Sequence, residues 1–165
     1  MRDMKIGLLF GSFNPPHYGH IALGDIVKDL VDEVWYVPAY QNPGKKEKAV
    51  DIDFRIQMLQ SVGLKVSDIE REMGEYPHYT YDVMKELQKK YPEHHFSVIC
   101  GEDINPGRWR NGGKLIKEFG VIKTARIPGL SSTILKEKLR NGESLEEICP
   151  PEIEKIIRDN NLYSL

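Results

Sequence analysis

The chain has 165 residues, of which 40% are hydrophobic and 29% charged, and its formal net charge is −2. This composition predicts an ordinary globular protein with one domain, residues 1–165, and argues against broad, non-specific binding to nucleic acid. The sequence shows neither a signal peptide nor an apolar run long enough to span a membrane, so we expect a cytoplasmic protein without membrane partners. Cys100 and Cys149 show no metal or redox spacing, and Cys100, in an apolar run, is expected to be a reduced core residue.

Five short apolar segments alternate along the chain with segments of helical pattern. The apolar segments are rich in Val, Ile and Phe and are largely apolar on both faces, which is typical of parallel strands buried beneath helices. We expect strands at residues 6–10, 33–39, 64–68, 96–101 and 120–125. We expect helices near residues 19–31, 51–61, 78–90, 113–118, 132–140 and 150–160. The alternation predicts an α/β fold, a doubly wound parallel five-stranded sheet with C-terminal helices, whose ligands bind beyond the carboxyl ends of the strands.

Two local features lie outside this pattern. The tetrapeptide "SLEE", which begins at Ser144, has capping-box spacing and predicts a short turn. Three further histidines, His78, His94 and His95, are expected on the surface.

Residues 11–20, "GSFNPPHYGH", lie where the first strand gives way to the first helix. Gly11 lets the backbone turn sharply and approach a ligand closely, and Gly19 keeps the first helical turn accessible. His17 and His20 are expected on one face of the helix N-terminus, where backbone N–H groups and the helix dipole favour an anion. The stretch therefore predicts an anion pocket lined by two imidazole donors, which can stay neutral there.

Other interpretations of this histidine pair are weaker. Both could be plain capping or surface residues. The spacing of the two histidines, after Gly, Pro, Pro and a buried strand, argues against this interpretation. A metal site would need a third ligand, and none is placed nearby in the sequence. The stretch is neither a Walker A loop nor the dinucleotide fingerprint of three spaced glycines.

The same stretch matches the G-x-F-x-P-x-H-x-G-H signature of the nucleotidylyltransferase superfamily, and "GLSSTILKEKL" (129–139) resembles that superfamily's second signature. Over most of its length the chain is similar to the bacterial nicotinate mononucleotide adenylyltransferases. The similar segments are "DEVWYVPAYQNPGK", "DFRIQML", "YPHYTYDVMKEL", "FSVICGEDINPGRW" and "IIRDNNLY". The resemblance implies a Rossmann-like nucleotidyltransferase fold and the transfer of AMP from ATP to a pyridine mononucleotide, with magnesium brought by ATP.

The resemblance also implies roles for individual residues. The catalytic group comprises His17, His20 and Lys136, the last standing where family members usually place an arginine. The residues implied for ATP binding are Gly11, Ser12, Phe13, His17, Gly19, His20, Ser131, Ser132 and Thr133. Those implied for acceptor binding are Lys45, Thr80, Asp103, Trp109 and Arg110. By themselves, residues 131–133 would be read as a plain N-cap, and Trp109 could equally be a partly buried core residue.

Two departures from the bacterial family leave the acceptor open. The loop from Gly101 to Trp109 is shorter, and "VIKTARIPGLSST" runs directly from the last strand to the Ser-Ser-Thr motif. That brevity resembles smaller superfamily members that act on nicotinamide mononucleotide, pantetheine phosphate or glycerol phosphate. Arg108 or Arg110 could attract a pyridine carboxylate, but backbone amides could serve equally. Transfer to another small phosphorylated acceptor, with CTP as a possible donor, and a non-catalytic nucleotide sensor remain alternatives, and a homo-oligomer is possible.

Overall fold

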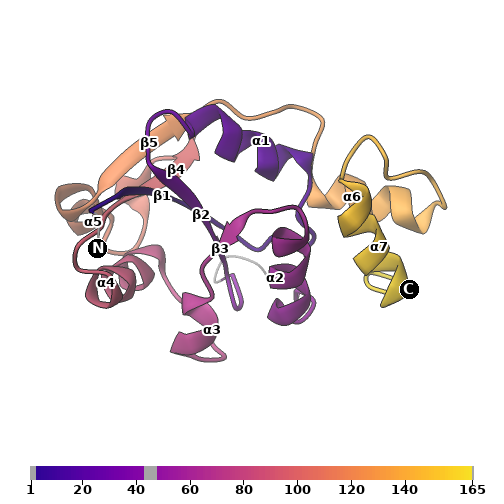
Figure 1. Ribbon diagram of the computed structural model, residues 1–165, viewed down its shortest axis with the longest axis horizontal. Helices are drawn as coiled ribbons and strands as arrows, with labels where there is room; N and C mark the ends of the chain where they lie inside the picture. Colours follow the sequence, from indigo (N-terminus) through magenta and orange to yellow (C-terminus); the bar gives the residue numbers. More distant parts are fainter. Residues whose placement is uncertain (1–2, 43–47, 165) are drawn as a thin grey trace.

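In the residues that the computed structural model describes, 3–42 and 48–164, a parallel sheet of five strands forms the centre, in the order β3-β2-β1-β4-β5 (Figure 1). The strands are β1 (Lys5–Gly11), β2 (Glu33–Pro38), β3 (Lys65–Val66), β4 (His95–Gly101) and β5 (Gly120–Thr124). The predicted doubly wound sheet is confirmed, with each strand close to its expected place. β3 is shorter than expected, because this edge strand pairs with β2 through two residues only, Lys65 with Trp35 and Val66 with Tyr36.

The predicted helices are present, with one addition. The helices are α1 (Tyr18–Val27), α2 (Ile52–Ser61), α3 (Ile69–Met73), α4 (Thr80–Lys90), α5 (Gly112–Glu118), α6 (Ser132–Arg140) and α7 (Pro151–Asp159), with a 3₁₀ turn, η1, at Pro106–Arg108. α1 ends before residue 31 because the chain turns back there, with the Asp32 N–H donating to the Lys5 carbonyl at 2.8 Å. α3 was not expected, since five residues are too few to show a helical period.

The two faces of the sheet bury separate apolar clusters. Successive strand residues point to opposite faces, so Leu8 joins one cluster and Leu9 the other. The Leu8 cluster packs beneath α3, α4 and α5, and the Leu9 cluster beneath α1 and α2 (Figure 1). A third cluster joins α2 to α6 and α7, which places the C-terminal helices beside the sheet rather than over it. Cys100 is buried in the strand, as expected.

The structure also settles the smaller expectations. Residues 144–148 form a turn, with the Ser144 hydroxyl accepting from the Glu146 N–H at 3.2 Å. His95 is exposed, but the expectation that His94 is a surface residue is wrong. Its ring is buried at the amino end of the sheet, where Nδ1 accepts from the Met4 N–H at 3.3 Å and the ring stacks on Tyr91, a tertiary contact that local sequence does not reveal.

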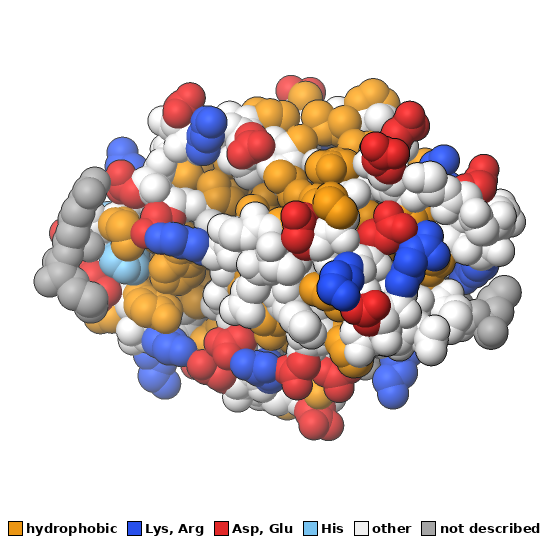
Figure 2. Space-filling model, turned by 45° about the vertical axis from the view of Figure 1, so that its right-hand side comes forward, with side chains coloured by type: hydrophobic (Ala, Val, Ile, Leu, Met, Phe, Trp, Pro, Cys, Tyr) orange, Lys and Arg blue, Asp and Glu red, His pale blue; other side chains and the backbone are white. Residues whose placement is uncertain are grey.

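The surface shown in Figure 2 has acidic and basic side chains interspersed, which agrees with the small net charge. Within the described part of the chain, every helix is too short or too polar to cross a membrane. The winding of the sheet reverses between β1 and β4, since β2 and β3 lie on one side of β1 and β4 and β5 on the other. At such a reversal the loops leave toward opposite faces and open a crevice at the carboxyl edge.

Candidate active site

A cleft of about 610 Å³ lies at the carboxyl edge of the sheet, where the winding reverses. The ends of four strands line it, through Gly11 of β1, Ala39 after β2, Gly101 of β4 and Thr124 of β5. The cleft brings together residues from Leu9 to Arg126, which are 117 positions apart in the sequence. The predicted site residues that line it are Gly11, Phe13, His20, Thr80, Trp109 and Arg110.

The two signature histidines cap the first helix. His17 is the N-cap residue of α1, and its Nδ1 accepts from the Gly19 N–H at 3.0 Å. His20 is the third helical residue, and its Nδ1 accepts from the His17 N–H at 3.1 Å. This is a reciprocal capping box in which two imidazoles replace the usual Ser or Thr and Glu. Their rings lie together as the sequence predicts, with centroids 3.9 Å apart.

The capping bonds assign the tautomer of both rings. A ring nitrogen that accepts a backbone N–H carries no proton, so a neutral ring holds its proton on Nε2. His17 is buried, and this burial lowers its pKa from 6.5 to about 4. The ring is therefore neutral at physiological pH and still a hydrogen-bond donor through Nε2. His20 is partly exposed in the cleft, and its Nδ1 is held in the same way.

Gly19 serves the histidine box more directly than it serves ligand access. A Cβ added at Gly19 would lie 2.7 Å from Cε1 and 2.9 Å from Nδ1 of His17. A side chain at this position would therefore displace the His17 ring. The structure therefore explains the glycine by its contact with His17, whereas the sequence suggested access for a ligand.

Phe13 supports the other histidine from the end of β1. The Phe13 ring is buried and contacts the His20 ring edge-on, with centroids 4.8 Å apart. Its φ of 48° places the backbone in the left-handed region, which turns the chain sharply after β1. The neighbouring Ser12 is also buried, and its carbonyl accepts from the buried guanidinium of Arg55 at 2.8 Å. The loop is therefore packed into the core rather than held out in solvent.

The Ser-Ser-Thr segment lies beside the histidine loop. The Ser132 hydroxyl donates to the Pro15 carbonyl at 2.8 Å, across 117 positions of sequence. Ser131 is the N-cap of α6, and its hydroxyl accepts from the Ile134 N–H at 3.1 Å. Thr133 is exposed. These three residues are outside the cleft lining, but the bond to Pro15 fixes the N-terminus of α6 against the loop that carries His17.

Three of the predicted acceptor residues, Thr80, Trp109 and Arg110, line the cleft. Thr80 is the first residue of α4, and Trp109 is half-buried between the cleft and the core beneath α4 and α5. Trp109 therefore has both of the environments that were expected as alternatives. The Arg110 guanidinium lies over the Tyr79 ring, 4.7 Å from its centroid, which is a cation–π contact.

Asp103 and Lys136 are not in the cleft lining. Asp103 forms an exposed ion pair with Nε of Arg126 at 2.9 Å, which lowers the pKa of the carboxyl, and it is Arg126 that lines the cleft. Lys136 on α6 places its Nζ 5.4 Å from the centroid of the Tyr163 ring. Lys45 lies outside the described residues.

A buried arginine beneath the cleft was missed by the sequence reasoning. Arg55 of α2 is 1% exposed, and its guanidinium donates to four backbone carbonyls at 2.6–3.1 Å. These carbonyls belong to Ser12, Ala39, Tyr40 and Val50. Arg55 therefore ties the loop after β1 to the end of β2. An arginine in the otherwise apolar register of "DFRIQML" was the available signal, because a charge on the core face of a helix needs buried partners.

Glu70 lines the cleft from α3, the helix that was not expected. Its carboxylate accepts from the Tyr40 N–H at 3.2 Å and is 3% exposed. Burial raises its pKa to about 8. Glu70 and Arg55 thus hold the same backbone segment, residues 39–40, from two sides.

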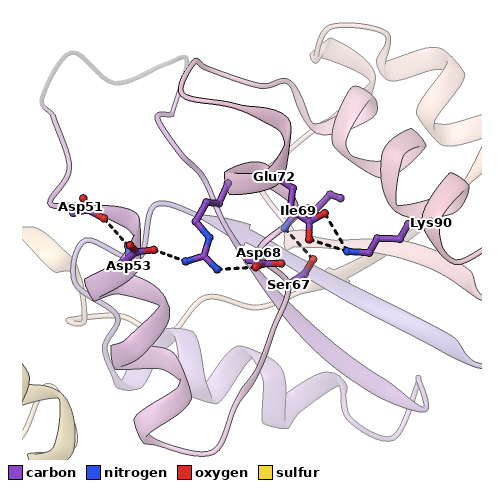
Figure 3. A network of polar contacts seen from close by, with 8 residues as sticks. Asp51, Asp53, Ser67, Asp68, Ile69, Glu72 and Lys90 are labelled. Atoms are coloured by element: carbon purple, nitrogen blue, oxygen red, sulfur yellow. Dashed lines mark hydrogen bonds and ion pairs between the residues drawn. The ribbon is translucent and has the colours of Figure 1, made fainter.

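Exposed ion pairs hold α3 in place on the outside of the molecule (Figure 3). Arg71 of α3 pairs with Asp53 of α2 and with Asp68, the latter at 2.8 Å. Glu72 pairs with Lys90 of α4 at 2.9 Å. Such exposed pairs contribute little stability singly. Together they link α3, which carries Glu70, to α2 and α4.

His78 was expected on the surface, and this is wrong. It is buried in the cleft wall, where Nε2 lies 3.0 Å from the Gly74 carbonyl. Its position just before the start of α4 at Thr80 was the available signal. Arg126 could also have been found, since it directly follows the last strand at the edge where ligands bind.

Comparison with known proteins agrees with this geometry. Residues 8–141 match the model of the family described as cytidylyltransferase-like. A protein of Exiguobacterium sibiricum named "Probable nicotinate-nucleotide adenylyltransferase" is 31% identical over 189 residues, which cover 98% of this chain and 100% of that protein. A protein of the same name from Oceanobacillus iheyensis is 31% identical over 186 residues, which cover 96% of each chain. Both alignments are longer than the 165 residues of this chain, so each includes gaps in this chain.

Solved structures show the same fold. Nicotinic acid mononucleotide adenylyltransferase of Plasmodium falciparum, solved in complex with NaAD, superposes with a TM-score of 0.77 at 20% identity, covering 96% of this chain and 97% of that one. A structure from Vibrio parahaemolyticus superposes with a TM-score of 0.79 at 20% identity, covering 96% and 94%. With the family match over most of its length and relatives similar from end to end, the chain belongs to the cytidylyltransferase-like family.

Proposed function

We propose that this protein transfers AMP from ATP to nicotinate mononucleotide, with release of pyrophosphate, as a step of NAD biosynthesis. The observation that carries the proposal is the imidazole capping box at the sheet's carboxyl edge, bonded through Pro15 to the N-terminus of α6. The names of relatives that are similar over the whole chain favour nicotinate mononucleotide as the acceptor. The sequence motifs by themselves left acid and amide acceptors open.

The reaction is an in-line displacement in which a phosphate oxygen of the mononucleotide attacks the α-phosphorus of ATP. The protein's task is to align the two phosphates and to neutralise the charge that develops on their oxygens. We assign His17 and His20 to this task as neutral donors through Nε2, because their Nδ1 atoms are already engaged. Fixed donors lose little free energy to reorganisation during the reaction.

The other residues divide between the two substrates. We assign Gly11, Ser12, Phe13, Gly19 and the start of α6 (residues 131–133) to the ATP side, with Lys136 as a flanking cation. We assign Thr80, Trp109 and Arg110 to the acceptor side, where the indole can stack on the pyridine ring. Asp103 acts through its ion pair with Arg126 rather than by direct contact.

Magnesium enters the proposal as part of the ATP substrate. Among residues 3–42 and 48–164, no cluster of three or more His, Cys, Asp or Glu side chains is placed to hold a metal ion. Phosphate oxygens and water are ligands that suit this ion, so a protein cage is not required.

The test is pyrophosphate release by the purified protein with ATP and each of four acceptors: nicotinate mononucleotide, nicotinamide mononucleotide, pantetheine phosphate and glycerol phosphate. We expect the highest kcat/KM with nicotinate mononucleotide, and replacing ATP by CTP to reduce it strongly. Preference for another acceptor would refute the substrate assignment and leave the transfer chemistry intact. Tight ATP binding without turnover on any acceptor would instead indicate a nucleotide sensor.

A further inference from the structure

The C-terminal residues lie against the histidine loop, 149 positions away in the sequence. The Tyr163 hydroxyl donates to Oδ1 of Asn14 at 2.7 Å. Leu162, beside it, is buried in the cluster that joins α2, α6 and α7, and its N–H donates to the Ile157 carbonyl at 2.9 Å. Burial raises the pKa of Tyr163, so its hydroxyl keeps its proton and remains a donor.

Asn14 is a junction of three segments. Its Oδ1 accepts from Tyr163 and also from the Val50 N–H at 3.2 Å, in the segment before α2. The next residue, Pro15, accepts from the Ser132 hydroxyl at 2.8 Å. The loop is thus held at two consecutive residues, just before the His17 cap. Loss of either bond would loosen the segment that aims the imidazoles.

The ring of Tyr163 also contacts the cation of α6. Nζ of Lys136 lies 5.4 Å from the ring centroid, within the range of a cation–π interaction. A lysine side chain has much rotamer freedom to lose, so an aromatic surface that restricts it favours one position of the ammonium group. One side chain therefore contacts both the histidine loop and Lys136.

The backbone at this end is arranged so as to turn the tyrosine inward. Asn161 and Tyr163 both have left-handed backbone conformations, with φ of 50° and 62°. Such conformations are unfavourable for residues other than glycine, and they are retained where the surrounding structure requires them. Here they reverse the chain after α7 and return Tyr163 to the loop.

We propose that Tyr163 is a positioning residue of the active site, its hydroxyl fixing the histidine loop through Asn14 and its ring fixing the ammonium group of Lys136. This inference rests on the proposed function. It makes the end of the chain part of the nucleotide site, although Tyr163 itself is not in the cleft lining. The two contacts can be separated by substitution.

The experiment compares two variants of Tyr163 with wild type. Tyr163→Phe removes the bond to Asn14 and keeps the ring; we expect kcat/KM for ATP to fall about three- to tenfold. Tyr163→Leu removes both contacts, and we expect a fall of about 30-fold. KM for nicotinate mononucleotide should change less than about twofold in both, since the acceptor wall is untouched, whereas general loosening of the fold would affect both substrates.

The ring contact is tested further in a Lys136→Met background. There, Tyr163→Phe and Tyr163→Leu should have the same kcat/KM, because the cation is gone. A pentafluorinated phenylalanine at position 163 keeps the shape of the ring and removes its negative face. We expect this variant to show the same fall of about 30-fold in kcat/KM for ATP as Tyr163→Leu. It replaces Tyr163→Leu in the comparison if the leucine variant does not fold. Calorimetry measures ATP affinity without an acceptor. We expect this affinity to be weaker in Tyr163→Phe than in wild type, and weaker still in Tyr163→Leu.

Tyr91 offers a matched control. It is a half-buried tyrosine at the other end of the sheet, with Nζ of Lys90 5.7 Å from its ring centroid. Tyr91→Phe and Tyr91→Leu should leave both KM values and ATP affinity unchanged. The inference is overturned if Tyr163→Phe has wild-type kinetics and ATP affinity, or if both KM values rise together. A wild-type protein inactive on every acceptor would refute the proposed function, while the ATP affinities would still decide the role of Tyr163.

Discussion

The wall of the cleft formed by β1 and α1 differs in burial and charge from the wall formed by the loops after β4 and β5. On the first wall, Phe13 is buried and contacts His20, and the buried His17 ring lies against His20 from outside the lining; backbone bonds or ring contacts fix all three. On the second, Arg126 lines the cleft and pairs with Asp103 outside the lining, and both side chains are about two-thirds exposed. The first wall cannot move without disturbing the core, whereas the second can adjust to a ligand at little cost. Changes to the first wall should therefore reduce kcat or stability, and changes to the second should alter KM.

The largest expected effect is that of His20→Ala on turnover. Removal of one fixed donor should reduce kcat about 10²- to 10³-fold, while ATP binding changes far less, because the donor acts mainly in the transition state. Steady-state kinetics and calorimetric titration with ATP measure the two effects. His95→Ala, an exposed histidine at the start of β4, is the control. Equal losses in kcat and ATP affinity would contradict the role given to His20.

The stability of the first wall should depend on Arg55. Arg55→Met removes the donor from two buried and two part-buried carbonyls and should reduce the free energy of unfolding by about 3 kcal/mol. Arg71→Met removes exposed ion pairs and should cost less than about 1 kcal/mol. Urea denaturation compares the two variants. If the two variants lost similar unfolding free energy, the burial of Arg55 would not be the reason for its effect on stability.

The pH dependence of stability should report His17. Its folded pKa, about 4, is below the ordinary 6.5, so between these values the unfolded chain binds more protons. Stability should fall as pH falls from 6.5 to about 4, by about 3 kcal/mol from this residue. Glu70, with a pKa raised to about 8, acts in the opposite sense, its burial costing stability as pH rises from 4.5 to 8.

A variant separates the two titrations. His17→Asn keeps an acceptor for the Gly19 N–H but cannot titrate, so its unfolding free energy should fall less steeply with acid than that of wild type. Denaturation midpoints at pH 4 to 7 provide the measurement. Parallel pH profiles for the two proteins would remove His17 as the cause.

On the second wall, Trp109→Ala should mainly affect the acceptor. Loss of stacking on the pyridine ring should raise KM for nicotinate mononucleotide about tenfold, with a smaller effect on kcat. Kinetics at saturating ATP measure this. An unchanged KM would exclude Trp109 from the acceptor site and leave its packing beneath α4 and α5 as its role.

The smallest effect is expected for Asp103→Asn. This change breaks the exposed pair with Arg126. The free energy of unfolding should change by less than about 1 kcal/mol, and KM for nicotinate mononucleotide by a few-fold. The KM difference between variant and wild type should shrink as salt is added, because exposed charges are screened. A loss of kcat as large as that of His20→Ala would mean that the second wall is as rigid as the first.

The amino-acid sequence by itself determined the sheet, most of the helices and the histidine pair. Buried parallel strands are apolar on both faces, and Gly and Pro mark their ends, so these signals are local. The spacing of His17 and His20 likewise placed both rings on one helix end before any tertiary contact was known.

Tertiary structure decided what the distant segments do. Whether Ser132 meets Pro15, whether Arg55 reaches the carbonyls of residues 12, 39 and 40, and whether Tyr163 returns to Asn14 depend on contacts between residues 15 to 149 positions apart. Short segments such as α3, which have no period of their own, also depend on packing. The same holds for His78 and His94, whose burial comes from neighbours in space. Local sequence patterns indicate which face of a helix or strand carries a side chain. The packing of the whole chain determines which residues that side chain contacts.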